Sequence, residues 1–187
     1  MLTKLKTMLK DFNLLATTSR GNERQMRSEL TYLLKDELGD PEPIVGKTGV
    51  RGLVVAKTCL APSDVIEKFR FMLQEHPYKF RYALRVMPIE KVVPTDLEDI
   101  KRAASELAAN IGENETYRVT VEKRYTSLHS KDFIEAAVTG IEATGSERKV
   151  NLETPDKILL IEVVGGLTGM ALIKPSYILA VLKEKML

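Results

Sequence analysis

Two basic residues, Lys123 and Arg124, stand where a predicted strand ends, and they are the strongest candidates for chemistry in this sequence. Residues 117–122 alternate between apolar and polar side chains, as expected for a strand with one buried face. A short polar loop then leads to a helix that we expect to begin near Ser130, its N-cap. Positive side chains beside the free N–H groups of a helix N-terminus are suited to phosphate. The pattern therefore predicts a phosphate-binding site at this strand end.

Arginines also gather at the start of an earlier predicted helix, residues 22–38. Arg20, Arg24 and Arg27 are spaced four and three residues apart, so they can share one side of its first turns. Basic side chains are unfavourable near a helix N-terminus because the helix dipole is positive there. Two interpretations stay open: a solvated face that nearby glutamates partly balance, or a second phosphate-binding surface.

A third basic stretch covers residues 79–91 and carries Lys79, Arg81, Arg85 and Lys91 against one acidic residue. The net charge of the 187-residue chain is only +2, which by itself does not indicate nucleic-acid binding. The uneven distribution of the charge is the stronger indication.

Composition narrows the class of protein. A hydrophobic content of 44% is ordinary for a globular chain, so we expect a packed core rather than disorder. No stretch approaches the roughly 18 apolar residues of a membrane span. The first ten residues lack the apolar core of a signal peptide, and we expect a cytoplasmic protein.

The sequence lacks the residue patterns of common catalytic and metal sites. His76 and His129 have no Cys or His neighbour at ligand spacing, and Cys59 is the single cysteine. The Gly-Lys-Thr run at residues 46–48 fails as a phosphate loop, because Pro41 stands where a glycine is required and a strand follows. We therefore expect no catalytic residue, no metal and no cofactor.

The order of predicted elements indicates an α+β (α/β mixed) protein with two domains. The first half predicts a strand at 12–17, the helix at 22–38, a hairpin within 44–57, a helix from Pro62 to His76 and a strand at 80–89. This is the ferredoxin-like split arrangement, in which one antiparallel sheet carries both helices on one face. We assign it to residues 1–90, with residues 1–10 as a short helical extension.

Residues 91–187 predict a second domain with a mixed sheet and helices. A capping box from Thr95 to Glu98 opens a helix that runs to about residue 109. After the strand and helix of the basic site, we expect strands near Val150, at 158–164 and up to Ile173, and a final helix over 177–182. The run at 158–164 is apolar almost throughout, which predicts a central strand buried on both faces.

Two single residues carry structural expectations. Cys59 lies in an apolar stretch, and we expect it to be a small buried core residue of a strand. Gly140 falls within a predicted helix, where it costs ~1 kcal/mol relative to Ala. We expect it to allow close packing of that helix on the sheet.

These motifs together resemble a known family. Residues 117–124, the helix that follows, residues 150–156 and residues 161–163 are similar to the THUMP domain, which occurs in tRNA-modifying enzymes behind an N-terminal ferredoxin-like domain. Residues 23–30 and 81–89 are similar to the stand-alone THUMP adaptor proteins of tRNA cytidine acetylation. The resemblance covers nearly the whole chain after residue 10.

The resemblance implies a tRNA-binding adaptor that grips the acceptor end of tRNA. The chemistry would come from a separate enzyme, an RNA cytidine acetyltransferase. The residues that match the family's basic positions, and so are implied to bind RNA, are Lys123, Arg124, Arg81, Arg85 and Arg118. The group of Arg20, Arg24 and Arg27 follows from helical spacing instead. Tyr125 departs from the family pattern, since many members have a basic or small residue there.

Two other functions stay open. The chain could be a tRNA-modifying enzyme itself, although no nucleophile with a neighbouring base and no cofactor loop is found. It could also be a ferredoxin-like small-molecule sensor or protein-interaction module that binds no RNA. Binding of tRNA, weakened by salt and by loss of the basic residues, separates the adaptor from the sensor.

Overall fold

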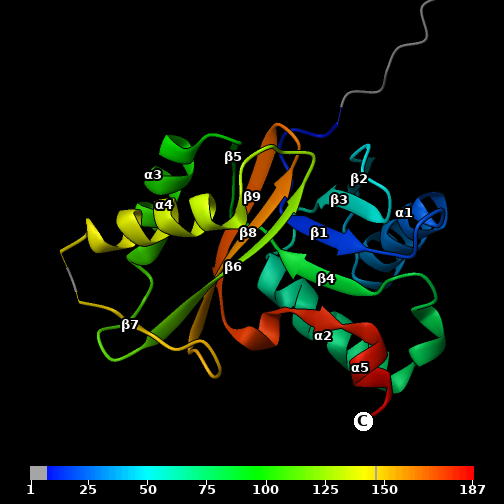
Figure 1. Cartoon of the computed structure of the whole chain (residues 1–187). Helices are drawn as coiled ribbons and strands as arrows, with labels where there is room; N and C mark the ends of the chain where they lie inside the picture. Colours follow the sequence, from blue (N-terminus) through cyan, green and yellow to red (C-terminus); the bar gives the residue numbers. More distant parts are fainter. Residues whose placement is uncertain (1–7, 146) are drawn as a thin grey trace, which may run out of the picture. The chain divides into compact units, whose positions relative to one another are not determined.

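The computed structural model describes residues 8–145 and 147–187 and shows an α+β protein with two sheets (Figure 1). Its contacts divide the chain into two units. The first contains the chain up to Met87 together with Leu179–Leu187, and the second is Pro88–Ile178. Most of the predicted helical extension at residues 1–10 lies outside the described residues, and residues 8–10 are not helical.

The first unit has the predicted order of strands and helices. Its elements are β1 (Leu14–Thr17), α1 (Glu23–Tyr32), β2 (Ile44–Lys47), β3 (Leu53–Lys57), α2 (Pro62–Glu75) and β4 (Arg85–Pro88). The sheet order β4-β1-β3-β2 is that of the ferredoxin-like split arrangement, and a further strand, β10, is added beside β4. Strand β3 pairs antiparallel with both β1 and β2. The predicted fold class is confirmed.

Apolar periodicity explains how the helices of the first unit pack. The α1 side chains of Met26 and Leu30 are buried, and so are Leu33 and Leu34 in the π-helical turn Leu33–Glu37 that follows it. These positions recur every three to four residues, which places them on one helical face. The buried residues of α2 follow the same spacing.

The predicted strand at 80–89 is shorter in the structure. A 3-10 turn, Pro77–Lys79, is followed by an irregular segment, and only Arg85–Pro88 forms the strand β4. The reason is that the backbone N–H groups of residues 81–83 donate to the carboxylate of Glu29 and are not used in a strand ladder. Local sequence does not reveal this acceptor, which lies far away in the chain.

The prediction that Cys59 is a buried strand residue is wrong. Cys59 is exposed and lies after the end of β3. Its Sγ donates to Oδ1 of the buried Asp40 at 3.4 Å, and this hydrogen bond is the main reason why the pKa of the thiol is raised. Asp40 also accepts a hydrogen bond from the Thr58 hydroxyl, so the cluster ties the chain after β3 to the loop that follows α1 and its π-helical turn.

The second unit holds a mixed sheet covered by two helices. Its elements are β5 (Lys91–Pro94), α3 (Leu97–Ala108), β6 (Thr116–Arg124), α4 (Ser130–Glu142), β7 (Lys149–Val150), β8 (Lys157–Val164) and β9 (Leu167–Ile173). The sheet order is β5-β9-β8-β6-β7, with β8 parallel to β6 and antiparallel to β9. Every residue of β8 after Lys157 is buried, which confirms the predicted central strand.

Three local predictions in the second unit need correction. Pro88 and Pro94 favour a short connector between the two domains, but the residues between them include β5, which pairs with β9. Asp96, not Thr95, caps α3 by accepting from the N–H groups of Glu98 and Asp99, whereas Thr95 Oγ1 bonds to Oγ1 of Thr168. Residue 129, not Ser130, is the N-cap of α4.

Gly140 lies at a contact between two helices, not between a helix and the sheet. A Cβ atom at this position would lie 2.2 Å from the backbone oxygen of Lys101 and 3.3 Å from the backbone nitrogen of Ser105, both on α3. The glycine therefore lets the backbones of α3 and α4 approach closely.

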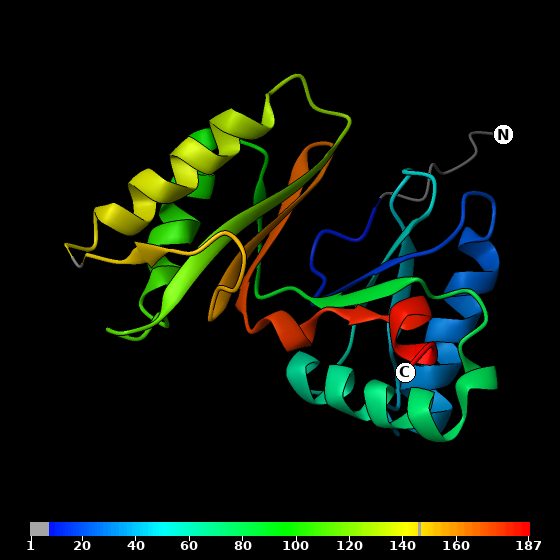
Figure 2. The same cartoon turned by 60° about the horizontal axis from the view of Figure 1, so that its bottom comes forward.

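The last segment of the chain differs from the prediction. In place of a helix at 177–182, the structure has a 3-10 turn (Pro175–Tyr177), the strand β10 (Leu179–Ala180) and the short helix α5 (Val181–Lys185). The strand β10 pairs with the open edge of β4, and α5 lies beside α2 (Figure 2). An ion pair between Arg70 and Glu184 at 2.9 Å holds α5 on α2. Residues 179–187 thus pack in the first unit, although the sequence pattern assigned them to the second.

Candidate nucleic-acid interface

The end of β6 places an exposed lysine near the start of α4. The Lys123 ammonium donates to the backbone oxygen of Leu128 at 3.0 Å, two residues before Ser130, the first residue of α4. No carboxylate among the described residues forms an ion pair with Lys123. Its charge therefore stays available for a phosphate at the position that the sequence predicts.

Arg124 is placed differently from its neighbour. Its guanidinium Nη1 lies 2.7 Å from Oε2 of Glu162, a residue of β8 that is fully buried. The Arg124 side chain is only 20% exposed. A buried carboxylate needs a charged partner, so the first role of Arg124 is to neutralise Glu162 inside this unit. Contact with a ligand is secondary to that role.

Tyr125 follows in a conformation that is unusual for its residue type. Its φ of 55° lies in the left-handed region, which a side chain with a Cβ disfavours. The preceding carbonyl oxygen, that of Arg124, accepts from the N–H of Gly165 at 2.8 Å, so the chain turns away from the sheet at Tyr125. The ring is 75% exposed and leaves a face open for stacking on a base.

Arg118, also on β6, holds the turn after β7. Its Nη1 donates to the backbone oxygen of Leu152 at 2.8 Å. Asn151 Oδ1 accepts from the N–H groups of Glu153 and Thr154, so this asparagine shapes the turn. Arg118 therefore has a structural role at a predicted RNA-binding position.

Asp156 closes the same turn against the start of β6. Its Oδ2 accepts from the backbone N–H of Thr116 at 2.7 Å and from the Thr116 hydroxyl at 3.0 Å. These bonds, the backbone one first, lower the pKa of Asp156 below its ordinary value. Asp156 therefore fixes the backbone of this turn.

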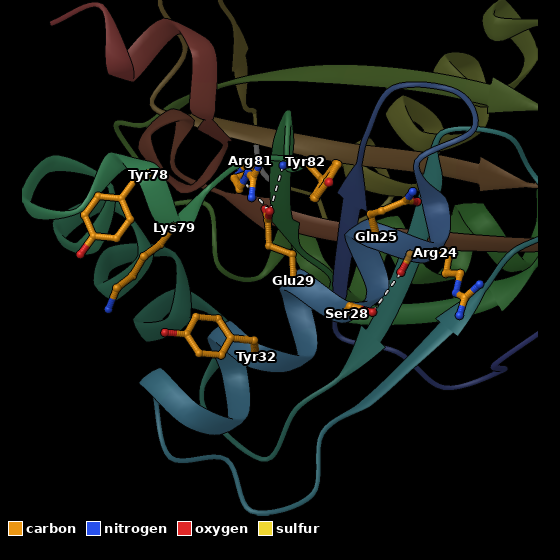
Figure 3. Close-up of a pocket in the computed structure, with 9 residues that line it drawn as sticks. All are labelled: Arg24, Gln25, Ser28, Glu29, Tyr32, Tyr78, Lys79, Arg81 and Tyr82. Carbon is orange, nitrogen blue, oxygen red and sulfur yellow. Dashed lines mark hydrogen bonds between the residues drawn. The ribbon is translucent and has the colours of Figure 1, made fainter.

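A second candidate surface is an open pocket in the first unit, with a volume of about 590 Å³ (Figure 3). It brings together two predicted RNA-binding residues, Arg24 of α1 and Arg81 of the segment before β4. The other residues that line it are Gln25, Ser28, Glu29, Tyr32, Tyr78, Lys79 and Tyr82. We call it the tyrosine–arginine pocket.

Helical spacing and one buried carboxylate build this pocket. Arg24, Ser28 and Tyr32 follow one another at four-residue intervals, which aligns them along one side of α1. Glu29, only 9% exposed, accepts three hydrogen bonds of 2.9–3.0 Å from the N–H groups of Arg81, Tyr82 and the next residue. The segment that carries Arg81 is thereby fixed against α1.

A hydrogen-bonded chain orients the tyrosine end of the pocket. The Tyr32 hydroxyl bonds to Oε1 of Glu37, which also pairs with the Lys79 ammonium at 2.6 Å. The bond to Glu37 raises the pKa of Tyr32 and, likewise, that of Lys79, while the bond from Lys79 lowers the pKa of Glu37. At neutral pH Tyr32 is therefore an uncharged phenol, and the charge of Lys79 is balanced.

The remaining predicted residues lie at different places in the first unit. Arg20 precedes α1, so it does not share the helical face of Arg24 and Arg27 as predicted. Arg27 is half-buried and lines a further hollow of about 460 Å³, which also includes Arg24 and Tyr32. Arg85 is half-buried on β4. The basic residues of the sequence point to the arginines of the pocket but not to its tyrosines, although aromatic residues 78, 80 and 82 alternate with Lys79 and Arg81.

Comparison with known families decides the identity of the second unit. The family model of the THUMP domain matches residues 94–172. Residues 94–172 form a THUMP domain. The THUMP domain lies within the second unit and includes β6 with its basic end. It indicates tRNA binding associated with tRNA modification. No curated protein sequence matches the chain.

Solved structures share the fold at low sequence identity. TrmN from Thermus thermophilus is 16% identical with a TM-score of 0.59, over 89% of this chain and 47% of that one. PH1313 from Pyrococcus horikoshii is 18% identical with a TM-score of 0.63, over 88% and 55%. A 4-thiouridine synthetase, in complex with RNA and ATP, is 16% identical with a TM-score of 0.55, over 88% and 42%. The chain thus spans about half the length of these proteins.

The described part of the chain lacks two further features. It contains no helix that is long and apolar enough to cross a membrane. It also contains no group of three or more His, Cys, Asp or Glu side chains placed to hold a metal ion.

Proposed function

We propose that this protein binds the acceptor end of tRNA and presents it to a separate modification enzyme. The observation that carries the proposal is the THUMP domain at residues 94–172, whose β6 ends in an exposed lysine, Lys123, beside the start of α4. The affinity is chiefly electrostatic, because Lys123 and a small number of further cations meet phosphates.

The proposal that this chain binds tRNA while a separate enzyme modifies it rests on the resemblance of residues 23–30 and 81–89 to stand-alone THUMP adaptors. In this proposal the chain itself catalyses nothing and binds no cofactor. The partner is an RNA cytidine acetyltransferase, and the complex acetylates a tRNA cytidine in the cytoplasm. The shared fold of a 4-thiouridine synthetase solved with RNA supports the RNA-binding part of this proposal.

The first test measures tRNA binding over a salt series for the wild type and Lys123→Ala. We expect weaker binding and a salt dependence that is shallower by roughly one unit, as expected for one lost phosphate contact. Lys174→Ala is the matched control, because Lys174 is an exposed lysine that follows β9 at the opposite end of the same sheet.

The partner is tested by co-purification of the RNA cytidine acetyltransferase with the tagged protein, followed by acetylation assays with and without the chain. The adaptor function predicts that acetylation of tRNA by the enzyme requires the chain. Failure of the wild type to bind tRNA at low salt, alone and with the enzyme, would overturn the proposed function.

A further inference from the structure

The tyrosine–arginine pocket of the first unit offers two kinds of contact side by side. Tyr78 is 69% exposed and Tyr32 is 41% exposed, so both rings present open aromatic surface. Within the described residues, neither Arg24 nor Arg81 forms an ion pair with a carboxylate. The pocket therefore combines open aromatic faces with two arginines that form no ion pair within the described residues.

The aromatic rings and the arginine Arg24 lie at different ends of the pocket. Figure 3 shows Tyr32, Tyr78 and Lys79 at one end and Arg24 at the other, with Ser28 between them. Arg24 and Tyr32 are eight residues apart on α1, a distance of about 12 Å along a helix that rises 1.5 Å per residue. This length and the volume of about 590 Å³ suit a ligand with a flat ring at one end and an anion at the other.

We propose that the pocket binds an unpaired nucleotide of RNA, with its base against Tyr78 and Tyr32 and its phosphates at Arg24 and Arg81. Aromatic stacking of a base and cationic contact with the backbone are the two interactions by which proteins hold single-stranded nucleic acid. The nucleotide must be unpaired, because both faces of a base inside a duplex are covered by its neighbours. The inference rests on the proposed tRNA binding and adds a separate site to it.

The pocket is held in shape before any ligand arrives. Glu29 fixes the backbone of Arg81 and Tyr82, and Tyr32 is tied through Glu37 to Lys79. The ring of Tyr78 packs edge-on against His76, with centroids 5.8 Å apart. Contacts that already exist in the free protein reduce the entropy lost on binding.

The test uses two exposed aromatic residues of the same unit. Tyr78→Ala removes the proposed stacking surface, whereas Phe71→Ala removes a ring of similar exposure, 66%, on α2 outside this pocket. Each variant is titrated with tRNA that keeps its unpaired 3′ nucleotides and with the same tRNA trimmed to a blunt end. We expect Tyr78→Ala to weaken binding of the intact tRNA about 5- to 100-fold. We expect Phe71→Ala and Tyr78→Phe to bind as the wild type does.

The two tRNAs and a free nucleotide separate the outcomes. The proposal requires that trimming removes the difference between Tyr78→Ala and the wild type. Equal binding of intact tRNA by Tyr78→Ala and the wild type overturns the pocket but leaves the proposed function standing if Lys123→Ala still weakens binding. If CMP or AMP binds the pocket while Tyr78→Ala retains full tRNA affinity, the occupant is a free nucleotide and the RNA inference is wrong. If the wild type binds no tRNA at all, both the pocket inference and the proposed function are wrong.

Discussion

The guanidinium of Arg124 lies 2.7 Å from the carboxylate of Glu162, which is fully buried in the THUMP sheet. A basic residue at the predicted RNA-binding strand end is therefore also part of the interior of the fold. Lys123, one residue earlier, is exposed and has no such partner among the described residues. The two neighbours should respond to mutation in opposite ways.

Replacement of Arg124 by Ala should lower the free energy of unfolding by about 3 kcal/mol, because it removes a charged partner of a buried carboxylate. Lys123→Ala should change stability by less than about 0.5 kcal/mol, as expected for an exposed side chain. Urea denaturation of both variants measures the difference. Equal stability of Arg124→Ala and the wild type would show that Glu162 does not depend on this guanidinium.

Gly140→Ala should lower the free energy of unfolding by about 2–3 kcal/mol, since the new Cβ would overlap the backbone oxygen of Lys101 on α3. Gly166→Ala is the control, because a Cβ at Gly166 meets no atom within 4 Å and its φ is not positive. Thermal denaturation of the two alanine variants compares them directly. A loss of stability of the same size at both positions would contradict the role of close α3–α4 packing.

Glu29→Gln should destabilise the first unit by about 1–3 kcal/mol, because the amide group of Gln turns a donor toward a backbone N–H that loses its acceptor. The same change should loosen the segment that carries Arg81. Hydrogen exchange at Arg81, Tyr82 and Ala83 reports on this segment, since their amide protons are those that Glu29 binds. Unchanged protection of these three amides in the variant would be incompatible with the proposed anchor.

The turn that Asp156 closes should depend on pH. The pKa of this carboxyl is lowered by its bonds to Thr116, so its charged form stabilises the fold fully above the unfolded pKa, about 3.9. The contribution is lost as the pH falls through the still lower folded pKa. Asp156→Asn should therefore have a lower Tm than the wild type at pH 7, and the gap should close in acid.

Tm values of wild type and Asp156→Asn between pH 7 and pH 2 test this dependence. Glu113→Gln removes one negative charge from the exposed surface of the same unit and controls for net charge. A gap in Tm that stays constant over the whole pH range would show that the charge on Asp156 contributes nothing.

Periodicity predicted most elements because it depends on neighbouring residues alone. The alternation before Lys123 and the three-to-four-residue spacing of α1 and α2 are local features, and the structure has these elements where they were expected. The strands β5 and β10 were missed because each is an edge strand that exists only through its partner, β9 or β4. Nothing in so short a segment identifies that partner.

The candidate site was predictable to a similar degree. Residue type identified Lys123 and Arg24 as cations, but not their surroundings. The ion pair of Arg124 requires Glu162, which lies on another strand. The tyrosine–arginine pocket requires α1 to lie beside residues 78–82. Both relationships join segments that are distant in sequence, so they became visible only in three dimensions.

The pairing of β10 with β4 has a consequence for how the protein is made. In chain order the whole second unit (the THUMP unit) lies between these two strands, so it is an insertion within the first unit. A ribosome therefore releases every residue of the THUMP unit before it releases the strand that completes the first sheet. The THUMP unit can fold while synthesis continues, whereas the first unit waits for residues 179–187 with the edge of β4 unpaired.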